Sequence, residues 1–358
     1  MKTTQKPHFA TDRPRPTLMI GRRRCGSHFI RLTLGKSSEF YSPYPLHIID
    51  FLPLVSLYGN LNNDDSYFQL ILDVIGLHNT NVVRWPDISF EPISIFDAIK
   101  TKPRNVHTIT WEMLLQAGRS HHAAVVMDKS LDTVLYGEEL ITIMDNILFL
   151  HVIRDPRAQV ASMTRAIIHD FDPLLNAISW KEAQDAAEKL ANKYPGKVLT
   201  IRYEDFLKEI ETTVRTITSF FNIKFLPEMV DTKASDEAKR LAKQSALWES
   251  NAKPPDLSNI AKYREFLTLE QIEQIETICG NYMDKYNYKR ETKAAALIND
   301  KIIDQAKQRS GAQRQKAWNK LKDDNIRDYQ ARKQRAWYIA AVRQRLLEES
   351  TTTEQKRR

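Results

Sequence analysis

The chain has 358 residues, 42% of them hydrophobic, which is enough to bury the core of one large domain or two smaller ones. Its two cysteines exclude a disulfide framework and favour a reducing compartment. The formal net charge of +8 lies entirely in residues 291–358, which hold 17 Lys and Arg against 9 Asp and Glu, whereas residues 1–290 hold 36 of each. A body of balanced charge does not favour nucleic acid as a partner.

The N-terminal segment, residues 1–16, is polar, contains prolines and lacks an apolar run of signal-peptide length, so we expect a flexible arm there. The most apolar later stretch, residues 45–58, is too short to span a bilayer and contains Asp50. We therefore expect no transmembrane segment and a cytoplasmic protein.

From Thr17 onward, short apolar runs alternate with amphipathic stretches, a pattern typical of β-α-β units around a parallel sheet. Four runs predict strands buried on both faces, and they cover residues 17–20, 123–127, 147–153 and 197–203. Four stretches predict helices, and they cover residues 27–34, 156–169, 205–221 and 268–286. The sequence therefore predicts an α/β fold with a central parallel sheet flanked by helices.

The segment after Arg290 differs from the body, because it has no proline and is dominated by Gln, Lys, Arg and Ala. A rough helical stripe runs along it, formed by Trp318, Leu321, Tyr329, Trp337 and Leu346. We expect a basic helical C-terminal extension of one or two long helices over residues 291–358. Its charge would suit nucleic acid or an acidic membrane surface. A solvated hairpin, or packing on the body or on a second subunit of a homodimer, is the alternative.

The first chemically informative segment runs from the first predicted strand into a glycine-bounded loop and then into a helix that opens at Ser27. Gly21 and Gly26 let the backbone turn tightly, Arg24 adds a positive charge, and the start of the helix offers free N–H groups to an anion. The Gly-x4-Gly spacing matches the start of a Walker A loop, but Ser27-His28 replaces the Lys-Ser/Thr that an NTPase needs for phosphate and magnesium. The loop predicts an anion site and argues against an ordinary ATPase. An arginine-rich surface turn without a ligand is the alternative.

A second anion site is expected at the end of the strand predicted over residues 147–153, which delivers Arg154 to the edge where open α/β sheets bind ligands. Asp155 and Pro156 suit the N-cap and first position of the next helix, whose first two turns include Ser162. Arg154 can make a forked contact with a phosphate while Ser162 donates its hydroxyl to the same group. A local Arg154–Asp155 ion pair is the alternative. Two anion sites at successive strand ends suit a ligand with separated phosphate-like groups.

These two motifs resemble those of the sulfotransferases that use 3′-phosphoadenosine 5′-phosphosulfate (PAPS). Arg24-Cys-Gly-Ser-His-Phe29 is similar to the family's 5′-phosphosulfate loop, and Arg154-Asp-Pro-Arg-Ala-Gln-Val-Ala-Ser162 is similar to its 3′-phosphate motif. Three shorter segments resemble further family motifs: Met127-Asp-Lys-Ser130, Ile201-Arg-Tyr-Glu-Asp-Phe206 and Ala261-Lys-Tyr263. The resemblance covers roughly residues 17–290 and is closest in style to bacterial, tyrosylprotein and carbohydrate sulfotransferases. It implies a P-loop NTPase-like sulfotransferase fold and a catalytic domain over that range.

The resemblance also implies a role for each matching residue. The 5′-phosphosulfate would be held by the loop residues Arg24, Cys25, Gly26, Ser27 and His28. The 3′-phosphate would be held by Arg154, Ser162 and Lys262. Phe29 and Tyr203 stand where the family packs aromatic rings near adenine, and Lys129 stands where a lysine stabilises charge on the sulfate. No metal is implied. His28 replaces the family's small hydroxyl residue, so one sulfate contact would be lost or made by the imidazole.

Transfer to a hydroxyl also needs a general base that takes the acceptor proton. The tyrosylprotein branch of the family has a glutamate shortly after the first helix, and at about that distance this chain has His47. We therefore predict His47 as the base, with Glu39 as the runner-up, and Arg24 and Lys129 as the other catalytic residues.

The function implied by the resemblance is transfer of a sulfuryl group from PAPS to a hydroxyl of an unidentified acceptor, with 3′,5′-bisphosphoadenosine (PAP) as the product. Carbohydrate, tyrosine, lipid and small-molecule acceptors all stay open. A P-loop nucleotide kinase or NTPase is one alternative, and a non-catalytic nucleotide-binding protein with a basic interaction tail is the other.

Several further residues are not assigned to the site. The adjacent pair His121-His122 makes a poor metal site, because neighbouring side chains point apart. Three arginines beside Cys25 could make its thiol reactive, although the family fills that position with many residue types. Three tryptophans could line an acceptor pocket but are more often core residues: Trp111, Trp180 and Trp248.

Overall fold

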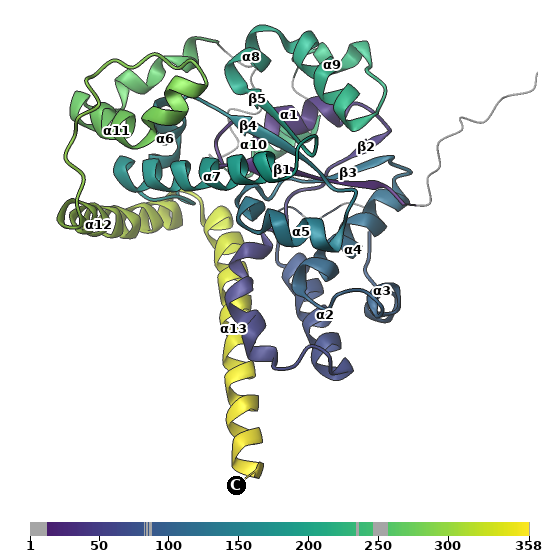
Figure 1. Cartoon of the computed structure of the whole chain (residues 1–358). Coiled ribbons are helices and arrows are strands. Elements are labelled where there is room, and N and C mark those ends of the chain that lie inside the picture. Colours follow the sequence, from purple (N-terminus) through teal and green to yellow (C-terminus); the bar gives the residue numbers. More distant parts are fainter. Residues whose placement is uncertain are drawn as a thin grey trace, which may run out of the picture.

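The computed structural model describes residues 13–81, 83, 85, 88–233, 236–245 and 257–357. Parallel strands form one sheet in the order β2-β3-β1-β4-β5, with helices on both faces (Figure 1), which confirms the predicted α/β fold. The strands are β1 (Arg15–Gly21), β2 (Phe40–Tyr41), β3 (Val125–Asp128), β4 (Leu148–Ile153) and β5 (Val198–Arg202). The sequence did not predict β2, because two residues are too few to show a strand period.

Helices connect and cover these strands. They are α1 (Ser27–Leu34), α2 (Asp64–Asn79), α3 (Pro92–Ile99), α4 (Val106–Ser120), α5 (Gly137–Ile143), α6 (Pro156–Thr164), α7 (Pro173–Lys193), α8 (Tyr203–Lys208), α9 (Ile210–Phe221), α10 (Asp236–Ala242), α11 (Leu269–Lys285), α12 (Asp300–Asp324) and α13 (Ile326–Arg357). Because strand side chains alternate between the two faces, Leu18 and Ile20 of β1 pack in the core beneath α2, α4 and α7. Met19 packs in the second core, beneath α1 and α9.

Several element boundaries differ from the predicted ones by one or more residues, and three of these differences affect the site or its supports. β1 begins at Arg15, inside the predicted arm, because its backbone pairs with β3 from that residue onward. The helix predicted over residues 156–169 ends at Thr164. The helix predicted over residues 205–221 is divided at Glu209, whose non-helical backbone (φ −131°, ψ 58°) separates α8 from α9. Tyr203 therefore opens α8 instead of ending a strand.

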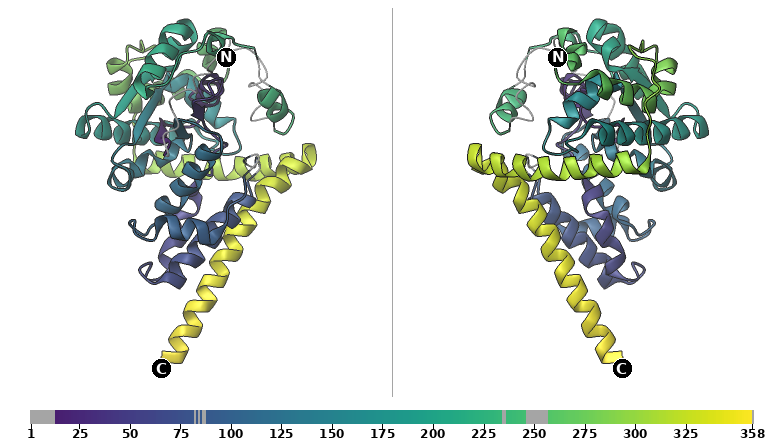
Figure 2. Two further views of the ribbon diagram at one scale, coloured as in Figure 1. Left: turned by 90° about the vertical axis from the view of Figure 1, so that its right-hand side faces the viewer. Right: turned by 90° about the vertical axis from the view of Figure 1, so that its left-hand side faces the viewer.

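The C-terminal extension consists of the two long helices α12 and α13, in agreement with the predicted helical extension. They meet next to Asn325, where α13 turns back beneath α12, so that the two helices form a V (Figure 2). α12 lies along α7, whereas α13 passes α2 and then runs on beyond the body of the protein. Within the described ranges, no helix combines the length and the apolar character needed to cross a membrane.

Candidate active site

The loop between β1 and α1 turns back through three residues in the left-handed region: Gly21 (φ 125°), Arg24 (φ 74°) and Gly26 (φ 89°). Gly26 has a second constraint, because a Cβ atom there would lie 2.0 Å from the ring of Tyr203. The helix then starts at Ser27, as predicted, so the free N–H groups of its first turn face the loop. This arrangement is a backbone cradle for an anion.

The two predicted anion motifs come together in space. β1 and β4 are neighbours in the sheet, with Gly21 in register with Val152, so their carboxyl ends lie side by side. Arg24 Nε donates to Ser162 Oγ at 3.1 Å, and Arg154 Nη1 donates to the Arg24 carbonyl oxygen at 2.9 Å. Each motif thus holds a residue of the other, which makes them one continuous site.

The site is rich in positive charge. Burial, with repulsion from Arg154 and Arg165, lowers the pKa of Arg24 to about 10. Within the part of the chain that the structure describes, neither Arg154 nor Arg165 forms an ion pair with a carboxylate. The sequence reasoning missed Arg165, which lies one turn after Ser162 at the end of α6. Arg22 and Arg23 of the loop pair with Asp132 at 2.8 Å and 2.6 Å, whereas Arg154 and Arg165 leave an excess of positive charge that would stabilise a bound anion.

The loop between β1 and α1 is tied to α6 by one buried glutamine. Gln159 Nε2 donates to the carbonyls of Arg22 at 2.7 Å and Arg23 at 3.0 Å, and its Oε1 accepts from Trp180 Nε1 at 2.9 Å. The sequence analysis did not assign Gln159 to the site, although it lies in the same predicted helix as Ser162. Trp180 is fully buried and is therefore a core residue that orients Gln159.

Lys129 follows β3 and faces the same loop. Burial, with repulsion from Arg31, lowers the pKa of Lys129 to about 7. His28 lies close to it: burial, with repulsion from Arg31, Lys129 and Arg24, holds the pKa of His28 well below its usual range. Its Nε2 atom is buried without a hydrogen-bond partner in the described structure. A neutral imidazole and a lysine that titrates near neutrality therefore stand beside the cradle.

The two candidate bases are in different places. His47 lies close to the site. Burial is the main cause that holds the pKa of its imidazole well below the usual value, and repulsion from Arg23 and Lys129 lowers this pKa further. Glu39 lies at the opposite edge of the sheet: its carbonyl accepts from Val125 N at the start of β3, and its carboxylate accepts from Lys224 N at 2.7 Å. Glu39 is therefore not placed to act as the general base beside Lys129.

Aromatic rings line one side of the cradle. The guanidinium of Arg154 lies over the Tyr203 ring, 5.1 Å from its centre. Phe29 packs edge-on against Phe206 with ring centres 5.5 Å apart. The neighbouring Cys25 is fully buried, and burial raises the pKa of its thiol to about 11, so the nearby arginines do not make it reactive.

Lys262 is exposed in a short 3₁₀ helix, η7 (Lys262–Glu265), which packs against α6. Its predicted contact with the 3′-phosphate stays a prediction. Trp111 is buried and lines a cavity at the amino-terminal edge of the sheet, away from the loop, and Trp248 lies outside the described residues. The described residues contain no group of three or more His, Cys, Asp or Glu side chains that could hold a metal ion.

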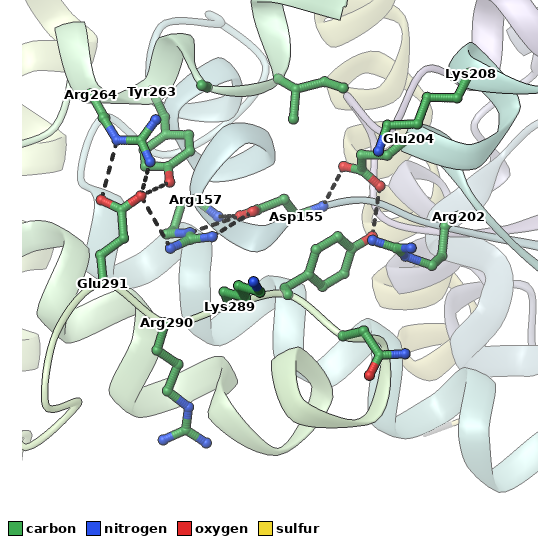
Figure 3. A pocket seen from close by; sticks show the side chains of 14 residues that line it. Asp155, Arg157, Arg202, Glu204, Lys208, Tyr263, Arg264, Lys289, Arg290 and Glu291 are labelled. Atoms are coloured by element: carbon green, nitrogen blue, oxygen red, sulfur yellow. Dashed lines mark hydrogen bonds and ion pairs between the residues drawn. The ribbon is translucent and has the colours of Figure 1, made fainter.

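A buried ionic network supports the turn that carries Arg154, and a pocket of about 360 Å³ exposes part of it (Figure 3). Asp155 caps α6 and forms an ion pair at 2.7 Å with Arg157. Arg157 also pairs at 2.7 Å with Glu276, which is fully buried. Glu204 accepts the Asp155 N–H at 2.9 Å and a hydrogen bond from Tyr288 at 2.8 Å. The network thus holds the first turn of α6 in place.

Replacing Glu276 with alanine is expected to destabilise the protein by about 3–5 kcal/mol, because it leaves the Arg157 guanidinium buried with one partner fewer. Glu276 also accepts the backbone N–H groups of Glu291 and Thr292 at 2.8 Å each, so the closing segment would lose its anchor. Urea unfolding of the two proteins measures the difference. An E276A midpoint equal to that of the wild type would contradict the structural role of the network.

Comparison with known proteins gives the family of the chain. The model of the "Sulfotransferase family" matches residues 16–227, more than half of the chain. Among solved structures, the chain is similar to the sulfotransferase domain of the Synechococcus PCC 7002 olefin synthase (20% identity, covering 78% of this chain and 98% of that chain, TM-score 0.49). It is also similar to sulfotransferase STF9 from Mycobacterium avium (14% identity, 78% and 79% covered, TM-score 0.43) and to mouse sulfotransferase SULT7A1 complexed with PAP (12% identity, 78% and 86% covered, TM-score 0.39). No curated protein matches the chain. On the family match over this range, the chain belongs to the sulfotransferase family.

Proposed function

We propose that the chain transfers the sulfuryl group of PAPS to a hydroxyl of an acceptor. The observation that carries the proposal is the joining of two anion motifs into one site by the Arg24–Ser162 and Arg154–Arg24 contacts. A donor with a 5′-phosphosulfate and a 3′-phosphate presents two separated anions, which suits two cationic groups at adjacent strand ends.

The residues present fit this donor. In the proposal, the loop amides, Arg24 and Ser27 bind the 5′-phosphosulfate, because the left-handed turns and the start of α1 direct N–H groups toward one point. Arg154 and Ser162 bind the 3′-phosphate, with Arg165 as a further cation on the same helix end. The Nε2 of His28, which has no hydrogen-bond partner among the described residues, takes the place of the hydroxyl that the family motif implies at this position.

Transfer moves the sulfur from the 5′-phosphate oxygen to the acceptor oxygen, so negative charge grows on the departing phosphate. Arg24 and Lys129 offset that charge, and fixed cations and N–H donors do this without reorganising. His47 accepts the acceptor proton, since its low pKa leaves the imidazole neutral. A bound dianion opposes the field of Arg23 and Lys129 and therefore makes His47 a stronger base.

Donor binding is expected to take up close to one proton at pH 8. A lysine with a pKa of about 7 is mostly neutral at that pH, and a neighbouring anion favours its charged form, so the pKa of Lys129 rises on binding. Calorimetry of PAP binding in buffers with different ionisation enthalpies measures the uptake. The K129R variant should bind PAP without uptake, because arginine stays charged. Equal uptake by K129R and the wild type would rule out Lys129 as the source.

The NTPase alternative finds little support in the site. Asp128 ends β3, beside the loop, where a magnesium-binding acid could lie. However, Asp128 Oδ1 accepts two hydrogen bonds from Ser130, one from its N–H at 2.9 Å and one from its hydroxyl at 2.8 Å. Burial also raises the pKa of Asp128. A carboxylate turned inward in this way does not present itself to a metal bound to nucleotide.

A turnover assay tests the proposal. The protein is incubated with ³⁵S-labelled PAPS and, separately, with ATP and magnesium, in the presence of carbohydrate, phenolic peptide and lipid alcohol acceptors. We expect PAP and a labelled product with at least one acceptor class, and no ATP hydrolysis. Hydrolysis of ATP while PAPS stays intact would overturn the proposal in favour of the NTPase.

A further inference from the structure

The backbone of His47 is held on both sides of its Cα atom by residues distant in the sequence. Its N–H donates to Ser130 Oγ at 3.3 Å, and its carbonyl accepts from Arg335 Nη2 at 2.8 Å. Ser130 in turn donates its hydroxyl to Asp128 at 2.8 Å. The turn after β3, beside the loop between β1 and α1, and a helix of the C-terminal extension therefore hold the same residue between them.

His47 needs such support, because its backbone is in the left-handed region (φ 53°, ψ 50°). That conformation is unfavourable for a residue with a Cβ atom and persists where the surroundings enforce it. It also directs the chain into the short 3₁₀ helix η1 (Ile48–Asp50) that follows.

Arg335 is well suited to enforce it. Besides the His47 carbonyl, its guanidinium contacts Asn81 Oδ1 at 3.1 Å and Asp50 Oδ2 at 3.3 Å, and its side chain is only 15% exposed. The guanidinium thus joins η1 to the segment that follows α2, and it uses a different nitrogen for each of its three partners. Lysine has one nitrogen and cannot reproduce this geometry.

The helix that carries Arg335 is itself fixed on the body. Tyr338 OH donates to the Asp73 carbonyl at 3.0 Å, and Arg345 Nη1 donates to the buried Asp73 carboxylate at 3.3 Å. The Tyr338 hydroxyl lies so close to Gly76 that a Cβ atom there would be 2.0 Å away. α13 therefore acts as a rigid support for Arg335.

Within the described residues, the imidazole of His47 makes no hydrogen bond of its own. Its Nδ1 is buried without a hydrogen-bond partner in the described structure, and its ring meets Tyr44 edge-on at 6.1 Å. The charged groups that face it are Arg23 from the loop, Lys129 after β3 and Arg335 from α13. Catalytic histidines are usually oriented by a hydrogen bond to the second ring nitrogen. Here the orientation of the ring depends on its backbone.

We propose that Arg335 is a positioning residue for His47, and that the C-terminal extension thereby completes the acceptor side of the active site. The proposal rests on the proposed function, in which His47 takes the acceptor proton. It gives the extension a place in the catalytic unit rather than the role of a separate basic tail.

NMR of the full chain with ¹³C-labelled histidine rings tests the contact directly, with H47A to assign the signal. In R335A we expect the His47 ring signal to move and its pKa to rise by at least one unit, because a cation is lost and water gains access. The matched control is R343A, an exposed arginine on the same helix. His151, whose ring is bonded to Gln184 at 2.7 Å within the core, should titrate identically in every variant.

Two further measurements separate the possible failures. PAP should bind R335A within twofold of the wild type, while PAPS turnover falls at least tenfold, and R335K should recover only part of that loss. An unmoved His47 signal in R335A, or an equal shift in R343A, would overturn the positioning role. Wild-type protein that does not bind PAP would instead remove the proposed function, whatever the NMR result.

Discussion

Replacing Arg154 with alanine is expected to weaken PAP binding by roughly two orders of magnitude, whereas AMP binding should change much less. The reason is that a forked contact between arginine and phosphate contributes about 3 kcal/mol. AMP lacks the 3′-phosphate and thus reports on the loop alone. This matters because Arg154 also donates to the Arg24 carbonyl, so the variant could disturb the loop.

Isothermal calorimetry with both nucleotides checks this expectation, and the preference for PAP over AMP is the decisive quantity. R154K should keep part of the preference for PAP over AMP, because lysine retains the positive charge but cannot contact the phosphate through two nitrogens. R215A removes a solvent-exposed ion pair with Glu211 on α9 and should behave like the wild type. An R154A protein with an undiminished preference for PAP would show that another group reads the 3′-phosphate.

Gly26→Ala is the substitution expected to have the largest combined effect on stability and on PAP binding. The backbone at φ 89° disfavours any residue with a Cβ atom by about 1–2 kcal/mol. The new methyl group would also lie 2.0 Å from the Tyr203 ring, so the loop or the ring must move. We expect a loss of stability larger than the backbone term alone and no measurable PAP binding.

Gly196→Ala is the matched control for this substitution. Gly196 has a φ of 83°, close to that of Gly26, but a Cβ atom there would meet nothing within 4 Å. G196A should therefore lose only about 1–2 kcal/mol and bind PAP normally. Urea unfolding and calorimetry on both variants measure the two effects. PAP binding by G26A at wild-type strength would contradict the described cradle.

The sequence predicted the parts of the site whose signals are local. The loop from Gly21 to Gly26, the start of α1 at Ser27 and the Asp155 cap before α6 each depend on residues adjacent in the chain. The parallel sheet follows from the same alternation of apolar runs and helices. The sequence predicted two anion sites at successive strand ends, but it did not predict the 3.1 Å contact between Arg24 and Ser162 that joins them.

The rest depends on tertiary contacts that no local pattern encodes. Gln159 looks like an ordinary polar helix residue until its two bonds to the loop carbonyls are seen. Arg335 lies 288 positions from His47, in a segment whose stripe and charge predicted a helix but not its contact surface. Residues 35–102 carried no recognisable motif, so the elements η1, α2 and α3 within them could not be derived.

The central claim is tested most directly by calorimetric titration of the wild-type protein with PAP, AMP and ATP–magnesium. The joined anion sites predict selective binding of PAP, at least tenfold tighter than either of the others, through the 3′-phosphate beside Arg154 and Ser162. Binding of ATP–magnesium as tight as or tighter than that of PAP, with no advantage from a 3′-phosphate, would contradict it.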